Sequence, residues 1–435
     1  MKYFKESTYN LYYSIDNKTV VYNIVSGSGA YVDQDTLMSI KTGDVSNIES
    51  QQELAKLGFI VPSKVNEYLR LKEIALGEVW NPNPREMLFV ITPSMGCNLN
   101  CKYCFESHHV RKGASSVMSD EIQEKIIDFI GHKIIHGSKK LLSHVSLSFF
   151  GGEPTLHLDS VCKISSAIKR ICQQHNVLFD ARIITNAVLL TESNGRRLKE
   201  AGVSRAQITL DGMAEDYAKR KGVSISTFDT VIRNICDNAD ILRIKIRVNV
   251  DEDNKNTVPI LMEHLFDSNG LKDRVSLYFA QIKKWNDNDE ISFISSKSYG
   301  DCLEHYFDTA LKRGWIKSII KKPPKIRTTS CGMIRSGSIG IGYDGSLFRC
   351  THGFSDPNNA VIGDIFSGLY ANAYDYNYRT WDGMKKCEDC KYFPVCWGGC
   401  RNNALLYNDY PDCELVRKET DLCVLYSFLS QNESV

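Results

Sequence analysis

Cys97, Cys101 and Cys104 form a C-x3-C-x2-C triplet whose side chains and spacing point to a definite chemistry. A 4Fe–4S cube needs four ligands, so three thiolates leave one iron open to a small molecule. The apolar run at residues 87–92 precedes the triplet and is typical of a buried parallel strand. The cysteines then fall in the loop after a first strand, where α/β barrels place their chemistry. Buried or zinc-binding thiols are the alternative interpretation.

The run at residues 95–105 resembles the radical S-adenosylmethionine (SAM) enzymes. This resemblance implies that SAM chelates the open iron through its amino and carboxylate groups. One electron from the cluster then cleaves SAM to methionine and a 5′-deoxyadenosyl radical. The resemblance makes Cys97, Cys101 and Cys104 the catalytic cluster ligands and places the aromatic ring of Tyr103 near the adenine.

A second motif, Gly151-Gly152-Glu153-Pro154, follows the next expected strand. Small residues let the backbone approach a ligand, and the carbonyls and Glu153 can accept hydrogen bonds from an ammonium. Such a stretch is often only a turn. Its place one β/α unit after the triplet resembles the family's motif for the SAM amino group, which implies that Gly151, Gly152 and Glu153 bind SAM.

The next two strand ends match the same family in part. Thr185 and Asn186 resemble the start of a Thr-Asn-Gly stretch, with Ala187 in place of glycine, and could face the SAM ribose. Thr209 stands in the serine position of a Ser-Leu-Asp-Gly strand end. The resemblance implies that these side chains contribute to the SAM site.

Two arginines are candidates for the SAM carboxylate. Asp216 and Arg220 resemble an Asp-x-x-x-Arg element that follows in many relatives, and Arg247 and Asn249 occupy a strand Arg-x-Asn. A guanidinium binds a carboxylate well, although surface ion pairs are the commoner role of such residues. We expect Arg220 at the cofactor and leave Arg247 open.

A second group of cysteines lies in the last quarter of the chain. Its first segment is Cys331-x13-Gly345-x4-Cys350, and its second is Cys387-x2-Cys390-x5-Cys396-x3-Cys400, followed by Cys413 and Cys423. Four clustered thiolates could also bind zinc. The spacings resemble the SPASM domain, which implies two auxiliary 4Fe–4S clusters in addition to the SAM-binding one.

The resemblance assigns the auxiliary ligands as follows. The cluster nearer the active site takes Cys331, Cys350 and Cys400, and its fourth position is open or filled by a distant residue such as Cys302. An open position could bind a substrate thiolate. The distal cluster takes three ligands plus a trailing cysteine, for which we expect Cys413 and keep Cys423 as the alternative; the three are Cys387, Cys390 and Cys396.

Composition narrows the class of protein. The chain has 435 residues, a net charge of +1 and 43% hydrophobic residues, enough for two or three domains. The near-neutral charge gives no support for binding nucleic acid or a membrane surface. No long apolar run or signal peptide is present, so we expect a cytoplasmic protein, in which 15 cysteines indicate metal or redox chemistry.

Three regions are expected. Residues 1–80 contain two β-rich runs joined by a hairpin signal at 16–18 and resemble the winged-helix-like, leader-binding modules of peptide maturases; a plain cap on the barrel is the alternative. Residues 81–320 alternate strands with helices and predict an α/β fold, a partial (β/α)6 TIM-like barrel. Its expected strands are 88–92, 144–150, 181–185, 205–210, 243–250 and 275–281. Residues 321–435, after the break at 321–324, form the cysteine-rich SPASM domain.

The combined resemblance implies a radical SAM/SPASM oxidoreductase that modifies a ribosomally made precursor peptide. The radical would abstract hydrogen, and the auxiliary clusters would accept an electron, which favours an oxidative thioether or C–C cross-link. The expected partners are a precursor with a leader segment and an external electron donor of the flavodoxin or ferredoxin type.

Three alternatives remain: sulfatase-maturase-like oxidation of a protein, peptide epimerisation, and a non-enzymatic electron carrier. Sulfatase maturases usually carry Asp directly after the proximal cysteine, and here Thr351 and His352 follow Cys350. The open triplet argues against a carrier, which would normally complete each cluster with four ligands. His352 and Asp344 are candidate bases, although a structural role is the more ordinary one for each.

Overall fold

The structure is a computed structural model that describes residues 3–45, 47–104, 106, 116–282, 292–320, 322–354, 360–370, 372–380, 385–408 and 410–432. Lys321, the first residue of the expected break, lies outside these ranges. The chain forms two compact units. We call Pro82–Ile319 with Gly332–Asn377 the barrel unit, and Met1–Asn81 with Ile320–Cys331 and Tyr378–Val435 the terminal unit.

The barrel unit is built on one sheet with the strand order β11-β10-β9-β8-β7-β6-β12-β13-β14-β15. The six strands from β6 to β11 are parallel to their neighbours, as the α/β prediction requires. They are β6 (Glu86–Ile91), β7 (His144–Phe149), β8 (Leu178–Thr185), β9 (Val203–Thr209), β10 (Arg243–Val250) and β11 (Val275–Gln281). The predicted bounds of β10 and β11 are confirmed, and β8 begins three residues earlier than predicted.

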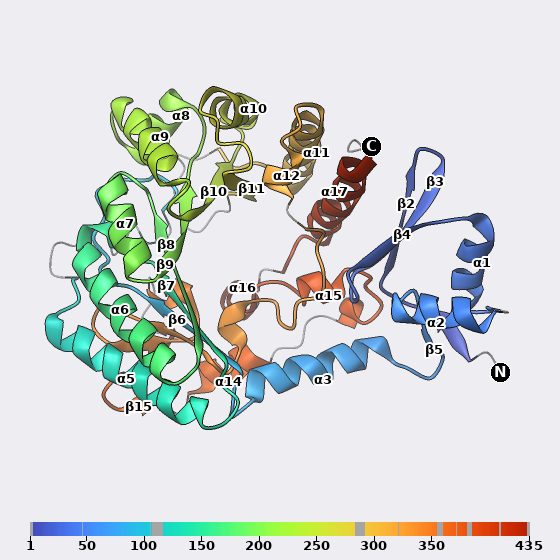
Figure 1. Ribbon diagram of the computed structural model, residues 1–435, viewed down its shortest axis with the longest axis horizontal. Helices are drawn as coiled ribbons and strands as arrows, with labels where there is room; N and C mark the ends of the chain where they lie inside the picture. Colours follow the sequence, from blue (N-terminus) through green and yellow to red (C-terminus); the bar gives the residue numbers. More distant parts are fainter. Residues whose placement is uncertain are drawn as a thin grey trace. The chain divides into compact units, whose positions relative to one another are not determined.

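Helices alternate with these strands, and Figure 1 shows α5, α6 and α7 lying along one side of the sheet. The apolar positions Val161, Ile164 and Ile168 of α6 recur at helical spacing and are fully buried. The helical elements are α5 (Asp120–Ser138), η1 (Pro154–His157), α6 (Leu158–Gln174), α7 (Glu192–Glu200), α8 (Ala214–Lys221), α9 (Ser226–Asn238), α10 (Val258–Glu263), η2 (His264–Ser268), α11 (Ser296–Lys312), α12 (Ile316–Ile319), η3 (Gly332–Ile334), η4 (Thr351–Phe354) and α14 (Ala373–Thr380).

The sheet continues into the region expected to be a separate domain. Strand β12 (Ser338–Ile341) pairs in parallel with β6, placing Ile339 beside Phe89. Antiparallel pairing then adds β13 (Ser346–Phe348), β14 (Val361–Asp364) and β15 (Gly368–Leu369). Every residue of β12 is buried, so this short strand gains its stability from packing. The two compact units therefore do not coincide with the three consecutive regions expected from the sequence. The assignment of those regions to domain families stays a prediction.

The terminal unit contains a three-stranded antiparallel sheet with the order β2-β3-β4. Asp16 and Asn17 join its first hairpin with φ of 50° and 60°, the backbone of a two-residue type I′ turn. The elements before residue 82 are β1 (Phe4–Glu6), β2 (Asn10–Ile15), β3 (Lys18–Asn23), β4 (Ser28–Val32), α1 (Gln34–Thr42), α2 (Ile48–Lys56), β5 (Ile60–Pro62) and α3 (Glu67–Trp80). The β-rich runs are confirmed, and the winged-helix-like assignment stays a prediction.

The two ends of the chain share hydrophobic cores within this unit. Val424 and Phe428 of α17 pack with Leu11, Val20 and Tyr22 of the sheet. A second core joins N-terminal Tyr9, Leu71 and Ala75 to C-terminal Cys387, Phe393 and Trp397. The C-terminal helices are η5 (Lys385–Cys387), α15 (Phe393–Cys396), α16 (Arg401–Tyr407) and α17 (Cys413–Asn432).

Candidate active site

A cavity of about 620 Å³ opens at the carboxyl ends of the parallel strands. This size falls within the range of about 300–1,000 Å³ that small-molecule sites occupy. The cavity brings together the predicted residues Cys97, Cys101, Tyr103, Cys104, Gly151, Gly152, Glu153, Thr185, Asn186 and Thr209. Arg247 of β10 and Gln281 of β11 also line it, so the ends of five strands and the cysteine loop meet at one site, as in α/β barrels generally.

The three cysteines of the triplet are half-buried in the cavity wall and interact electrostatically with one another. Burial raises the pKa of Cys97 to about 11 and that of Cys104 to about 12. Iron is bound by thiolates, so cluster assembly here must displace protons from thiols that hold them tightly.

The Gly151-Gly152 turn packs directly on the cysteine loop. The Gly152 N–H donates to the Ser94 carbonyl at 3.1 Å, and the Glu153 N–H donates to the Gly96 carbonyl at 2.8 Å. A Cβ on Gly152 would lie 2.1 Å from the Gly96 oxygen, so only glycine allows this approach. Gly151 adopts a φ of +119°, which other residues rarely take. The two glycines thus set the position of the loop that carries Cys97.

Glu153 is 1% exposed and links two strand ends. One carboxylate oxygen accepts from the Thr155 N–H at 3.0 Å and from the Thr185 hydroxyl at 2.7 Å, and the other accepts from the Asn186 N–H at 2.7 Å. Burial raises the pKa of Glu153, and these donors oppose the rise. In the structure these donors connect Glu153 to Thr185 and Asn186, and its contact with the SAM ammonium stays a prediction.

Asn186 connects this network to the triplet. Its side-chain amide donates to Asn98 Oδ1 at 2.8 Å and lies 3.9 Å from the Cys97 sulfur. Ala187 follows with a φ of +64°, the left-handed conformation that glycine adopts readily. The alanine therefore occupies the backbone conformation for which the glycine of a Thr-Asn-Gly stretch is suited.

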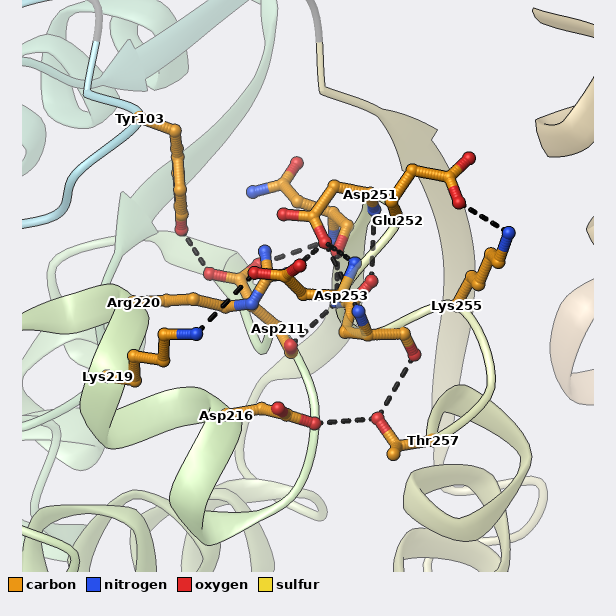
Figure 2. A network of polar contacts seen from close by, with 12 residues as sticks. Tyr103, Asp211, Asp216, Lys219, Arg220, Asp251, Glu252, Asp253, Lys255 and Thr257 are labelled. Carbon is orange, nitrogen blue, oxygen red and sulfur yellow. Dashed lines mark hydrogen bonds and ion pairs between the residues drawn. The ribbon is translucent and has the colours of Figure 1, made fainter. Parts of the chain in front are cut away.

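Arg220 and Lys221 are adjacent in the sequence but have different partners. Arg220 forms a buried ion pair with Asp251, while Asp216 accepts from the Thr257 hydroxyl at 2.6 Å, in the network that Figure 2 shows. Arg220, the residue expected at the SAM carboxylate, is not among the residues that line the cavity. Lys221 lines it, together with Arg247.

Sequence reasoning missed Lys221 and Glu106. Lys221 lies four residues after the buried Tyr217 on α8, so helical periodicity was the available signal. Glu106 is 3% exposed, lines the cavity, and has no hydrogen-bond partner for Oε1 among the described residues. Burial raises the pKa of Glu106 to about 8. Its only sequence signal is its position two residues after Cys104.

The proximal cysteine of the barrel unit lies near the cavity. Cys350 follows β13, and the next residue, Thr351, lines the cavity. Asp344 accepts from the Ser346 N–H and hydroxyl, both at 3.0 Å, so it shapes the turn between β12 and β13. Cys331 and Cys400 are exposed and belong to the terminal unit, so the proximal ligand set stays a prediction.

The distal cysteines gather within the terminal unit. The Cys396 thiol interacts electrostatically with Cys387, Cys413 and Cys390, and burial raises its pKa to about 11. Burial also raises the pKa of Cys423 to about 12, and its charged neighbour is Glu419. Cys413 therefore lies near the other three predicted distal ligands, and the choice between Cys413 and Cys423 stays a prediction.

The cysteine triplet suits an iron–sulfur cube. Among the described residues, no three His, Cys, Asp or Glu side chains converge closely enough to hold one metal ion. A 4Fe–4S cube does not require such convergence, because each thiolate binds a different iron. Cys97, Cys101 and Cys104, which all line the cavity, would hold the SAM-binding cube.

Comparisons with known proteins show what the chain is similar to. Residues 91–245 match the radical SAM superfamily. Fe-coproporphyrin III synthase of Methanosarcina barkeri is 22% identical over 401 residues, 82% of this chain and 92% of that protein. The cysteine-type anaerobic sulfatase-maturating enzyme of Clostridium perfringens is 22% identical over 348 residues, 73% of this chain and 89% of that enzyme. The solved structure of native anSMEcpe with bound AdoMet and Cp18Cys peptide has a TM-score of 0.59 at 19% identity, covering 80% of this chain and 99% of that one.

Residues 91–245 therefore match the radical SAM superfamily, and the chain is similar to proteins that include an anaerobic sulfatase-maturating enzyme. The family implies a 4Fe–4S cluster and SAM as cofactors. In the part of the chain that the structure describes, no helix is long and apolar enough to cross a membrane.

Proposed function

We propose that this enzyme is a radical SAM/SPASM peptide maturase that forms an oxidative cross-link in a ribosomally made precursor. The observation that carries the peptide assignment is strand β4 of the terminal unit. Among the described residues β4 pairs with β3 alone, so its other backbone edge offers donors and acceptors to an added strand. Gly29 and Tyr31 are exposed residues of this strand, and both lie next to Phe428 of α17. Peptides commonly bind such edges by strand addition, which suits a leader segment.

The barrel cavity supports the radical step of this proposal. When bound, the cluster and SAM supply a 5′-deoxyadenosyl radical. The chain's own residues hold the cysteine loop in place and enclose the site, chiefly through the Gly152 turn and Glu153. The cavity of about 620 Å³ has the size of a small-molecule site.

The distal cysteines support an oxidative outcome. Closing a thioether or C–C bond removes one hydrogen atom, which the radical takes, and one proton with one electron. The electron needs an acceptor, and a distal auxiliary cluster on Cys387, Cys390, Cys396 and Cys413 would supply it. An external flavodoxin or ferredoxin would provide the electron that starts each turnover.

The test is anaerobic incubation of the reconstituted enzyme with SAM, a reductant and the peptide encoded by a short reading frame beside this gene. A cross-linked product is about two mass units lighter than the substrate, because two hydrogens leave. An unchanged mass with one deuterium gained in heavy water would indicate epimerisation instead. Parallel incubations with a sulfatase peptide and with Fe-coproporphyrin III test the activities named for the relatives; turnover of either in place of the precursor contradicts the proposal.

A further inference from the structure

A buried ammonium lies beside the cysteine loop. Lys221 is 3% exposed and lines the cavity with Cys101. Its Nζ lies 2.9 Å from Asp211 Oδ2 and donates to the Tyr103 hydroxyl, which in turn donates to Asp211. Figure 2 shows the Tyr103 side chain directed at Asp211. The three side chains form a closed group, which we call the Lys221 triad.

Lys221 carries its charge in this group. Burial alone would lower its pKa, but the Asp211 carboxylate, Tyr103 and Cys101 raise the pKa well above the ordinary value. Tyr217 also faces it, with its ring centroid 5.8 Å from Nζ. Burial and Asp211 raise the pKa of Tyr103, so the phenol stays neutral. An ammonium and a carboxylate therefore persist together inside the protein because each neutralises the other.

The backbone fixes where this charge sits relative to the triplet. The Asn100 N–H donates to the Lys221 carbonyl and the Lys102 N–H donates to the Arg220 carbonyl, both at 3.0 Å. These two bonds hold Cys101 from both sides against the end of α8. Gly222 follows with a φ of +66° and lies against Asn100, so the loop and the helix end fit closely.

We propose that Lys221 is a positioning residue that sets the reduction potential of the cluster bound by Cys97, Cys101 and Cys104. Reduction adds one electron, delivered by a flavodoxin- or ferredoxin-type donor, and so adds one negative charge next to the ammonium. A nearby positive charge stabilises the reduced cluster, and a nearby negative charge destabilises it. Lys221 and Asp211 thus act with opposite signs. The inference depends on the family cofactor and is independent of the substrate.

The test compares four variants by EPR-monitored redox titration with dithionite, after iron analysis. The signal of the SAM-binding cluster is identified by its change on addition of SAM. Lys221→Met should shift the midpoint potential to more negative values, and Asp211→Asn should shift it to more positive values. The double variant should return toward the wild type. Lys219→Met, which replaces a lysine with a 68% exposed side chain on the same helix, should leave the potential unchanged.

A role limited to structure gives a different result. Unchanged potentials, or shifts of the same sign in Lys221→Met and Asp211→Asn at full iron content, would overturn the proposal. Weaker SAM binding with an unchanged potential would assign Lys221 to the SAM carboxylate instead. Loss of the cluster in both single variants would show that the Lys221 triad only stabilises the structure of the cysteine loop. If Lys221→Met alone loses iron, the sign of the Asp211→Asn shift decides.

Discussion

At the scale of single residues, the spacing of the cysteines predicts iron–sulfur chemistry, because this spacing can be recognised without knowledge of the fold. We expect replacement of Cys97, Cys101 and Cys104 by Ala to remove about four of about twelve irons and to abolish 5′-deoxyadenosine formation. The matched control is Cys162→Ala, because Cys162 of α6 does not line the cavity. This variant should keep its iron and its formation of 5′-deoxyadenosine. Iron analysis and chromatography of the SAM products provide the measurements. Continued 5′-deoxyadenosine formation by the triple variant would refute the central assignment.

Gly152 illustrates a requirement that backbone packing imposes. Its replacement by Ala would put a Cβ 2.1 Å from the Gly96 oxygen, so the turn or the cysteine loop must move. We expect Gly152→Ala to lower both iron content and SAM cleavage at least tenfold. Gly77→Ala is the matched control, because nothing lies within 4 Å of its Cβ and alanine favours α3 by about 1 kcal/mol. Equal behaviour of the two variants in iron analysis and thermal unfolding would contradict this account.

Glu106 predicts a pH dependence of the unfolding free energy. The unfolded side chain ionises near its ordinary pKa, while the folded one ionises at about 8, so stability falls as pH rises between these values. The fall is about 1.4 kcal/mol per pH unit at most between pH 6 and 7.5. Glu106→Gln should lack this component. Urea unfolding of the cluster-free protein at several pH values measures the difference, and parallel curves for the two proteins would contradict the raised pKa of the buried carboxyl.

At the scale of elements, the periodicity of apolar residues predicted the individual strands but not the pairing of strands that are distant in the sequence. The apolar runs that became β6 to β11 could be recognised because each is buried against helices on its own stretch of chain. The partner of Ser338–Ile341 could not be recognised, since its four residues pair with β6 across some 250 positions. Likewise, Arg220 and Lys221 are adjacent on α8 and therefore point in different directions: Arg220 faces Asp251, and Lys221 faces the cavity. The Asp-x-x-x-Arg pattern does not specify which of the two faces the cavity.

The start and the interior of α17 provide a matched pair of cysteines. Cys413 opens the helix and interacts with Cys396, whereas Cys423 lies ten residues further along, beside Glu419. We expect Cys413→Ala to lower iron by up to about four atoms per chain and to impair product formation more than SAM cleavage. Cys423→Ala should keep its iron. The reverse result in iron analysis would exchange the two assignments.

At the scale of the whole molecule, the sequence suggests consecutive domains, but packing joins the two ends of the chain in one unit. Tyr9 and Leu71 come from the N-terminal region and share a core with Cys387 and Trp397. Tyr68 of α3 packs on Phe393, with ring centroids 4.9 Å apart. No local pattern could reveal this, because the contacting residues are more than 300 positions apart and each run reads as an ordinary amphipathic element. The N-terminal region is thus part of the protein environment of the distal cysteines.

Deletion of residues 1–80 therefore tests more than leader binding. A module that only recruits a leader could be removed with every iron retained. Here the deletion would expose Cys387 and Trp397, which are 7% and 4% exposed in the structure. We expect the truncated enzyme to lose about four irons and to form no product. The barrel unit, with its own sheet and cavity, should still cleave SAM slowly without coupling to product formation.

Iron analysis, 5′-deoxyadenosine yield and product mass measured together separate the loss of leader binding from the loss of iron. Full iron content with only peptide binding lost would restrict the N-terminal region to recruitment, whereas loss of SAM cleavage as well would show that the barrel unit depends on it.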